Sequence, residues 1–256
     1  MRLGKNLLKL VLAAGIIIFG VVKYCSSSQE NPYTGETQYL DLTAEEEIAL
    51  GAQSTAYILR DHGGLYPNEA EQQKLKSVGS KLVENSIASA APYEFKFYLL
   101  ADDSTVNAFA LPGGPVFITK ALYNRLSNED QLAGVLAHEI GHIIGRHSAE
   151  QLAKQGFTNT ILTGVAVGSE SHEVTKAAAV LGNLANMKFG RGDELESDHL
   201  GVKIMLQSGY DPKALIEVMK ILKEASGGNS PSEFFSTHPD PDNRIEKIHD
   251  AIEKYQ

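Results

Sequence analysis

The chain has 256 residues, of which 43% are hydrophobic and 21% charged. This composition excludes disorder over most of the length and suits one ordinary domain with an added segment. The formal net charge is −9, so we expect no nucleic-acid partner, because an acidic protein is repelled by phosphate backbones. The single cysteine excludes an intramolecular disulfide and a zinc site built from cysteines.

Residues 1–25 are predicted to be a signal or membrane anchor. Basic residues come before an unbroken apolar or glycine run over residues 10–22, and the segment has no acid. This is the pattern of an export signal, and the positive-inside rule places the rest of the chain on the extracytoplasmic (periplasmic) side of a membrane in the cell envelope. Three fates are open: an uncleaved anchor, a cleaved signal, or lipidation at Cys25. The pattern favours the anchor, because no small-x-small cleavage site stands out and Lys23 and Tyr24 are unusual before a lipidated cysteine.

The segment 26–40 is polar and carries turn signals, which predicts a tether, so the folded domain is expected over 41–256. Apolar residues recur with helical spacing through most of that domain, and short alternating runs indicate a few strands. The fold class is therefore α+β, mainly helical with a small, mostly antiparallel sheet. Helices are expected at 43–63, 68–88, 128–155, 157–189 (one or two), 193–207, from 211 and at 241–254; strands are expected at 95–99, 106–111 and 116–119.

The centre of the sequence is an H-E-x-x-H pattern, formed by His138, Glu139 and His142. On a helix, positions i and i+4 share a face, so two imidazole nitrogens can bind one zinc ion. Glu139 lies one step round the helix, where it can act as a general base on water without binding the metal. His147, nine residues after His138, is expected off the ligand face and structural.

A catalytic zinc ion needs a third protein ligand and one open position. Glu194 and Asp198 are four residues apart on a predicted helix and share a face, whereas Glu196 points away and is expected in solvent. Glu194 as the ligand, with Asp198 behind His138 or His142, would complete such a site. From spacing alone, an ordinary acidic helix start that complements the helix dipole is equally compatible.

The combination of H-E-x-x-H and an E-x-x-x-D about fifty residues later resembles the gluzincin zinc endopeptidases of the CAAX-prenyl-protease, HtpX-like and BepA-like type, in their exported, single-anchor branch. The stretches Asn107–Gly114 and Ser236–Pro239 agree with the same family. The resemblance implies a zincin-type metallopeptidase domain with one Zn²⁺ per chain. It implies His138, His142 and Glu194 as metal ligands and Glu139 as the catalytic base.

The resemblance also implies two further catalytic residues near the C-terminus. His238 would stand over the metal, where it would donate to the developing oxyanion or act as a removable fourth ligand that keeps the enzyme latent. Arg244 would orient Glu194 or the oxyanion. A cation or N–H donor at that point is what a tetrahedral intermediate requires. A turn histidine and a surface arginine are the alternatives.

A substrate-binding edge is expected at the strand that contains Asn107, Ala108 and Phe109. A peptide would add to this edge by main-chain hydrogen bonds, with Asn107 holding a carbonyl. An interior strand is the alternative.

The expected function is membrane-tethered, zinc-dependent endoproteolysis of unfolded or misassembled envelope proteins, with a Glu-activated zinc-bound water as nucleophile. The expected partners are polypeptide substrates, the membrane, through residues 1–25, and an envelope protein that the sequence does not identify. The rival hypothesis is a chaperone-like envelope module with a latent or structural zinc site. Glu139 favours the enzyme, because a structural site has no need of an acid beside its first ligand.

Overall fold

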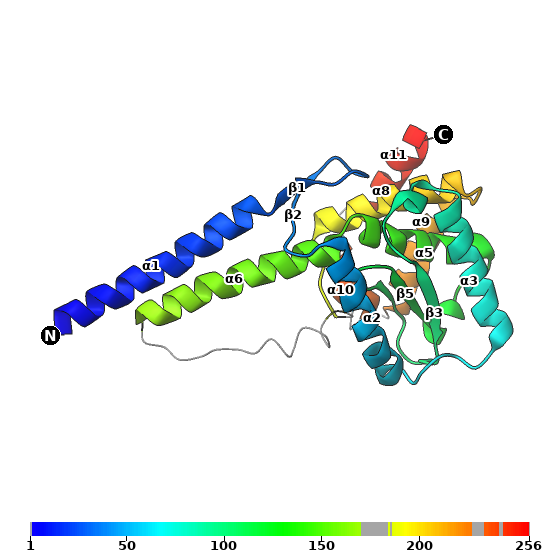
Figure 1. Ribbon diagram of the computed structural model, residues 1–256. Helices are drawn as coiled ribbons and strands as arrows, with labels where there is room; N and C mark the ends of the chain where they lie inside the picture. The colour runs from blue at the N-terminus through cyan, green and yellow to red at the C-terminus, as the bar shows by residue number, and fades with distance from the viewer. Residues whose placement is uncertain (1, 170–183, 185, 227–232, 241–242, 256) are drawn as a thin grey trace. The chain divides into compact units, whose positions relative to one another are not determined.

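The computed structural model describes residues 2–169, 184, 186–226, 233–240 and 243–255 (Figure 1). The chain divides into two compact units. One consists of Met1–Thr43 and Ala149–Val180, and the other of Ala44–Ser148 and Leu181–Gln256. The helix expected beyond residue 169 lies largely outside the described residues.

The first unit contains helix α1 (Arg2–Ser26), strands β1 (Ser28–Glu30) and β2 (Thr37–Tyr39), and most of helix α6 (His147–Ser169). Within the described part of the chain, one helix is long and apolar enough to cross a membrane by length and composition, namely α1 from Asn6 to Ser26. An apolar helix at this place fits the predicted membrane anchor.

The segment after α1 is more ordered than its polar composition predicts, because β1 and β2 pair antiparallel as a hairpin. The Asn31 carbonyl accepts a hydrogen bond from the Gly35 amide at 2.8 Å, and Gly35 has a φ of 75° that favours glycine. The Asn31 side chain also accepts from the Tyr33 amide at 2.8 Å. The turn signals that suggested a tether therefore close a hairpin.

The second unit is mainly helical around a small sheet, which confirms the predicted α+β class. Its helices are α2 (Ala44–Asp61), α3 (Glu69–Glu84), α4 (Lys120–Tyr123), α5 (Glu129–Ile144), α8 (Arg191–Gln207), α9 (Lys213–Ala225), α10 (Glu233–Thr237) and α11 (Arg244–Tyr255), with a 3₁₀ turn at Ile87–Ala90.

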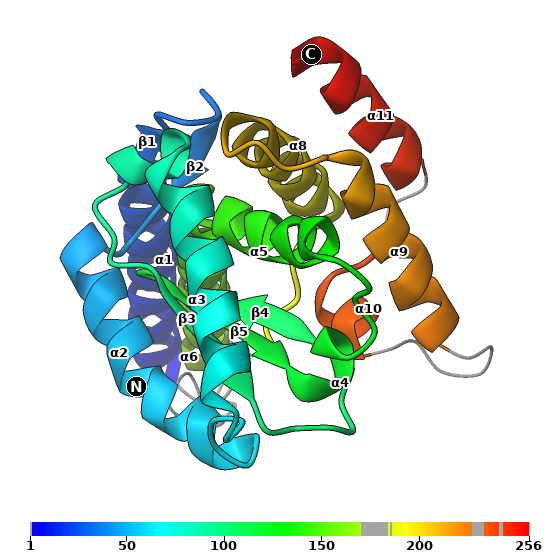
Figure 2. The same cartoon turned by 90° about the vertical axis from the view of Figure 1, so that its right-hand side faces the viewer.

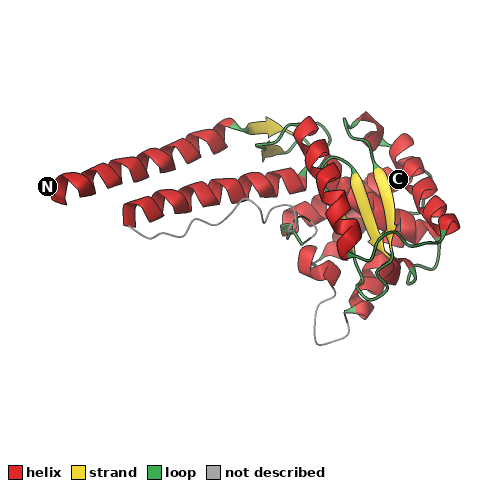
Figure 3. Cartoon of the chain, turned by 60° about the horizontal axis from the view of Figure 1, so that its bottom comes forward, coloured by secondary structure: helices red, strands yellow, loops and turns green. Residues whose placement is uncertain are grey.

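The sheet of the second unit has the order β3–β5–β4, and Figure 3 shows it among the helices. The strands are β3 (Lys96–Leu100), β4 (Ala108–Ala110) and β5 (Pro115–Thr119). β4 and β5 form an antiparallel hairpin, but β3 and β5 are parallel. The β3–β5 pair is the parallel exception to the mostly antiparallel pairing that was expected, because the hairpin places its second strand, and not its first, beside β3.

Helix α5 is the central element of the second unit. Every residue from Gln131 to Ile144 is buried, and α5 packs against α8, α9, α3 and β4 (Figure 2). A helix that is buried all round has no solvent face to carry polar groups, so polar side chains in it need partners inside the protein.

The helix predicted over 128–155 is in fact two helices, because α5 ends at Ile144 and α6 begins at His147. Arg146 stands between them with a φ of 57°, which breaks the helical path. Its guanidinium forms an ion pair with the buried carboxylate of Glu47 at the start of α2, with Nε donating at 2.8 Å. Although burial alone raises the pKa of Glu47, this arginine opposes the shift.

Replacing Arg146 by methionine is expected to lower the free energy of unfolding by about 2 kcal/mol, since among the described residues the Glu47 carboxylate then keeps the Tyr93 hydroxyl at 3.2 Å as its side-chain partner. Methionine has a similar length and meets the same backbone strain, so the difference reports the polar contacts of the guanidinium, of which the ion pair with Glu47 is one. Denaturant unfolding measures it, with the exposed Arg60→Met as the control. An unchanged midpoint in Arg146→Met would show that the pair contributes nothing.

Candidate active site

Helix α5 presents the H-E-x-x-H residues toward the interior of the second unit. Its N-terminus is capped by Asn128, whose side chain accepts from the Gln131 amide at 2.8 Å. One turn of helix separates His138 and His142, and their Nε2 atoms lie 3.1 Å apart. Both rings are almost completely buried.

Helix α8 brings the acidic ligand to the two histidines because α5 and α8 approach closely. A Cβ at Gly141 would lie 2.8 Å from the Ser197 carbonyl oxygen, and one at Gly201 would lie 3.3 Å from the His138 amide nitrogen. Glycine at these positions permits the approach. Glu194 then lies with Oε2 at 3.4 Å from His138 Nε2 and Oε1 at 3.4 Å from the second histidine.

His238 follows α10 and joins the same cluster. Its amide donates to the Phe234 carbonyl at 2.7 Å, and its ring stacks on the Phe234 ring at 4.4 Å. Its Nδ1 lies 3.1 Å from Glu194 Oε1, and its Nε2 lies 3.9 Å from Glu139 Oε1. One donor atom from each of four residues, His138, His142, Glu194 and His238, falls within 4.8 Å of the others.

Asp198 and Arg244 lie behind this cluster. His138 Nδ1 contacts Asp198 Oδ1 at 2.9 Å, so Asp198 supports the first histidine of the motif. Arg244 donates to both Asp198 oxygens, at 2.6 Å from Nε and 2.9 Å from one terminal nitrogen. Its other terminal nitrogen lies 3.2 Å from Glu194 Oε2. Arg244 was expected to orient either Glu194 or the oxyanion, and these contacts favour Glu194.

The cluster is built to attract one positive charge. Although burial opposes a charged ring, hydrogen bonds to Asp198 and Glu194 raise the pKa of His138 to about 9, whereas burial lowers the pKa of His142. The Nε2 lone pairs of the two rings face each other at 3.1 Å, where either a proton or a metal ion can bind. A divalent metal ion competes with that proton for the same lone pairs.

The spacing of the donors fits a metal ion of the size of zinc. Ligand atoms at ~2.0–2.1 Å in a tetrahedral set stand roughly 3.3 Å from one another. The two histidine Nε2 atoms lie 3.1 Å apart, and each has one carboxylate oxygen of Glu194 at 3.4 Å, Oε2 beside His138 and Oε1 beside His142. Glu194 Oε2 forms an ion pair with Arg244 at 3.2 Å, but no contact with hydrogen-bond geometry reaches it among the described residues.

Glu139 is fully buried beside the four donors but is not one of them. Neither carboxylate oxygen has a hydrogen-bond partner in the described part of the chain. Burial raises the pKa of Glu139, and the neighbouring His238 opposes that shift. A carboxylate with free oxygens and a raised pKa is suited to accept and return a proton.

The structure places two further residues beside the metal donors, His147 and Glu196, that the sequence did not predict there. His147 Nδ1 lies 2.9 Å from His142 Nδ1, and its Nε2 lies 2.9 Å from Glu196 Oε2. The expectation that His147 lies off the ligand face and Glu196 in solvent is wrong. It assumed one continuous helix, whereas the left-handed turn at Arg146 redirects the chain. The sequence signal for this break in the helix was Gly145 followed by the basic residue Arg146, shortly after the motif.

Of the expected substrate residues, Ala108 and Phe109 lie on β4, at an edge of the three-stranded sheet, and Asn107 directly precedes that strand. All three are buried. Asn107 Oδ1 has no hydrogen-bond partner among the described residues, and Asn107 and Phe109 line a hollow of about 180 Å³ together with Tyr57 and Glu233. Ala108 does not line it. No described contact joins Asn107 to the four-donor cluster.

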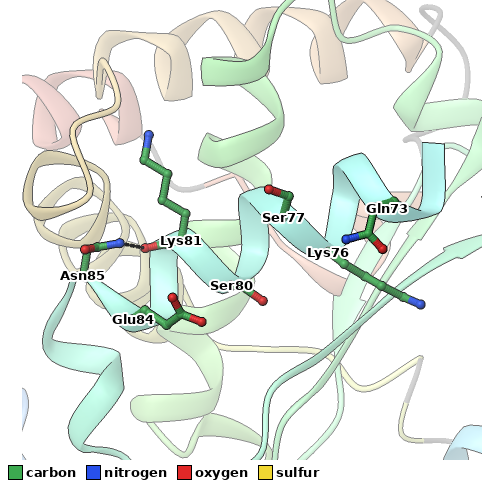
Figure 4. A pocket seen from close by; sticks show the side chains of 7 residues that line it. All are labelled: Gln73, Lys76, Ser77, Ser80, Lys81, Glu84 and Asn85. Carbon is green, nitrogen blue, oxygen red and sulfur yellow. Dashed lines mark hydrogen bonds between the residues drawn. The ribbon is translucent and has the colours of Figure 1, made fainter. Parts of the chain in front are cut away.

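A larger hollow lies on the outer face of α3 (Figure 4) and is lined by Gln73, Lys76, Ser77, Ser80, Lys81, Glu84 and Asn85. Here the side-chain amide of Asn85 donates to the Lys81 backbone carbonyl at 2.9 Å. All of its lining side chains come from α3 and the residue after it, and none belongs to the metal-donor cluster. Its chemistry is that of an exposed helix face.

Known proteins are similar in sequence to the part of the chain that contains these site residues. A family model described as peptidase family M48 matches residues 69–252. The chain is 31% identical over 254 residues to the beta-barrel assembly-enhancing protease of Escherichia coli (strain K12), covering 95% of this chain and 51% of that protein. It is 28% identical over 245 residues to the mitochondrial metalloendopeptidase OMA1 of Schizosaccharomyces pombe, covering 94% of this chain and 71% of that one. The chain therefore spans about half the length of the bacterial relative.

Proposed function

The chain belongs to peptidase family M48 and is a metallopeptidase by that membership, and we propose that it is a zinc-dependent endopeptidase that cuts unfolded or misassembled polypeptides outside a membrane. The membership confirms the resemblance identified in the sequence. One observation carries the proposal: four buried metal donors lie within 4.8 Å of one another, and beside them is the carboxylate of Glu139, which has no hydrogen-bond partner in the part of the chain that the structure describes.

In this proposal His138, His142 and Glu194 hold the metal ion. Two histidines and one glutamate form a ligand set typical of catalytic zinc. The bound ion supplies Lewis-acid polarisation of the scissile carbonyl and lowers the pKa of water.

The chain's own residues then move the proton. Glu139 accepts it from the attacking water and returns it to the leaving amine. The Nε2 atom of His238 has no hydrogen-bond partner within the described residues and lies 3.9 Å from Glu139 Oε1. Because its Nδ1 faces Glu194 Oε1 at 3.1 Å, His238 donates from Nε2 to the oxyanion that develops during attack as an imidazolium, with a proton on both ring nitrogens. The same ring stands close enough to act as a fourth ligand, which would make the enzyme latent until the ring moves.

We propose that the substrate binds in extended form along β4. This strand ends the three-stranded sheet, and main-chain pairing with an edge strand tolerates any sequence. Asn107 offers a buried side-chain oxygen that has no hydrogen-bond partner among the residues described, which suits a substrate amide. Such pairing selects unfolded segments, because folded ones cannot present a free strand.

We also propose that α1 tethers the enzyme. Residues 1–25 form the anchor or signal, and residues 41–256 the peptidase domain. The basic N-terminus favours a catalytic domain on the extracytoplasmic side of the envelope membrane. The name of the Escherichia coli relative refers to β-barrel assembly, which supports misassembled envelope proteins as substrates here and a partner protein in that machinery.

The first test is cleavage of casein by the full chain, purified in detergent and loaded with zinc. We expect cutting that a chelator stops and that added zinc restores. Cutting that survives complete removal of the metal would overturn the proposal, as would failure of the protein to bind zinc.

A third outcome, bound zinc without cutting, is resolved by His238→Ala. If His238 covers the metal, this variant gains activity. If the variant binds zinc and still cuts nothing, coverage of the metal by His238 is excluded as the cause of latency, and a loss of oxyanion stabilisation accounts for the inactivity.

A further inference from the structure

The two histidines of the motif differ in what their outward-facing nitrogens contact. His138 Nδ1 faces the carboxylate of Asp198 at 2.9 Å. His142 Nδ1 faces another imidazole, His147 Nδ1, at 2.9 Å, and His147 in turn contacts Glu196 Oε2 at 2.9 Å. The second histidine is therefore connected to a carboxylate through an intervening ring.

The two ends of this row of side chains, the metal ligand His142 and the carboxylate of Glu196, fix the positions of the protons along it. When His142 Nε2 gives its lone pair to a metal ion, its Nδ1 carries the proton and donates to His147 Nδ1. His147 must then carry its own proton on Nε2, where the carboxylate of Glu196 accepts it. Each nitrogen has one role, and no donor faces another donor.

The surroundings of His147 hold its ring in this place. Its side chain is fully buried, and the left-handed turn at Arg146 directs it back toward α8. A Cβ at Gly145 would lie 2.6 Å from His147 Nε2, so only glycine there leaves room for the ring. Phe189 stacks on the His142 ring at 4.1 Å and limits its rotation from another side.

We propose that His147 and Glu196 are positioning residues for the metal ligand His142. They fix its tautomer and the direction of its Nε2 lone pair, as a carboxylate does for other metal-bound histidines. Neither residue touches substrate. The inference rests on the proposed function, because it requires a metal ion in the four-donor cluster.

The test is the zinc affinity of the full chain, measured by competition with a chromophoric chelator. His147→Phe keeps a ring of similar size and removes both nitrogens, so we expect the affinity to fall by about 10–100-fold. Glu196→Ala is expected to weaken binding in the same direction. Glu196→Gln is expected to restore most of the affinity, because its amide oxygen still accepts from His147.

Two matched controls are available on α11: His249→Phe and Glu253→Ala change the same residue types at exposed positions and are expected to leave the affinity unchanged. A second readout is independent of folding losses. Nitrogen NMR of the zinc-loaded wild-type protein is expected to show the His147 proton on Nε2, and the absorption spectrum of the cobalt-loaded His147→Phe protein is expected to shift.

The outcomes separate the two proposals. If the wild-type protein binds no zinc, the proposed function fails. If it binds zinc but His147→Phe and Glu196→Ala bind it equally well, or if His147 carries its proton on Nδ1, the positioning role is wrong while the metallopeptidase stands.

Discussion

Replacing Glu139 by glutamine is expected to lower kcat for peptide hydrolysis by about 10²–10⁴-fold and to leave the zinc content unchanged. The carboxylate is fully buried, and both of its oxygens lack a hydrogen-bond partner within the described residues. It is outside the set of metal donors. Glutamine has the same shape but cannot accept a proton, so the loss falls on turnover.

The measurement is casein or peptide hydrolysis by zinc-loaded protein, with the metal content determined on the same sample. The matched control is Glu129→Gln, which makes the same change at an exposed position in the first turn of the same helix. The control is expected to keep wild-type activity. A Glu139→Gln enzyme that retains a tenth or more of wild-type turnover would show that another group removes the proton.

Much of the fold and of the candidate site follows from local sequence. The helices around His138 and Glu194 were expected because apolar residues recur with helical spacing and the motif fixes the spacing of its own residues. These are short-range properties. Asp198 was expected near one histidine for the same reason, since it shares a helix face with Glu194.

The rest depends on how distant segments meet. Which histidine Asp198 supports is decided by the crossing of α5 and α8, which the glycines at 141 and 201 permit. The parallel pairing of β3 and β5 is a property of topology and not of either strand. The contact between His147 and His142 follows from one left-handed residue, Arg146, whose conformation is stabilised by an ion pair with Glu47 about a hundred positions earlier.

Replacing Arg244 by methionine is expected to lower the free energy of unfolding of the metal-free protein by about 3–5 kcal/mol. The guanidinium is 1% exposed and contacts the buried carboxylates of Asp198 and Glu194. Although burial alone would lower the pKa of Arg244, these carboxylates raise it above its usual value. Methionine leaves both carboxylates with less compensating charge in a medium that solvates them poorly.

Arg244→Lys separates charge from geometry. A lysine carries the same charge but cannot donate two parallel hydrogen bonds to Asp198 while reaching Glu194, so an intermediate loss of stability is expected. The matched control is Arg191→Met, at an exposed position in the first turn of α8, for which a change within about 0.5 kcal/mol is expected. Denaturant unfolding measures all three.

The double variant Arg244→Met with Asp198→Asn tests the cause of that loss. If the penalty comes from an uncompensated buried carboxylate, neutralising Asp198 removes part of it, and the double variant is more stable than the sum of the single changes predicts. If the two changes simply add, Arg244 stabilises the protein through packing of its side chain and not through its charge. In that case a zinc ion, which compensates Glu194 directly, would not reduce the deficit of Arg244→Met, whereas the electrostatic explanation requires that it does.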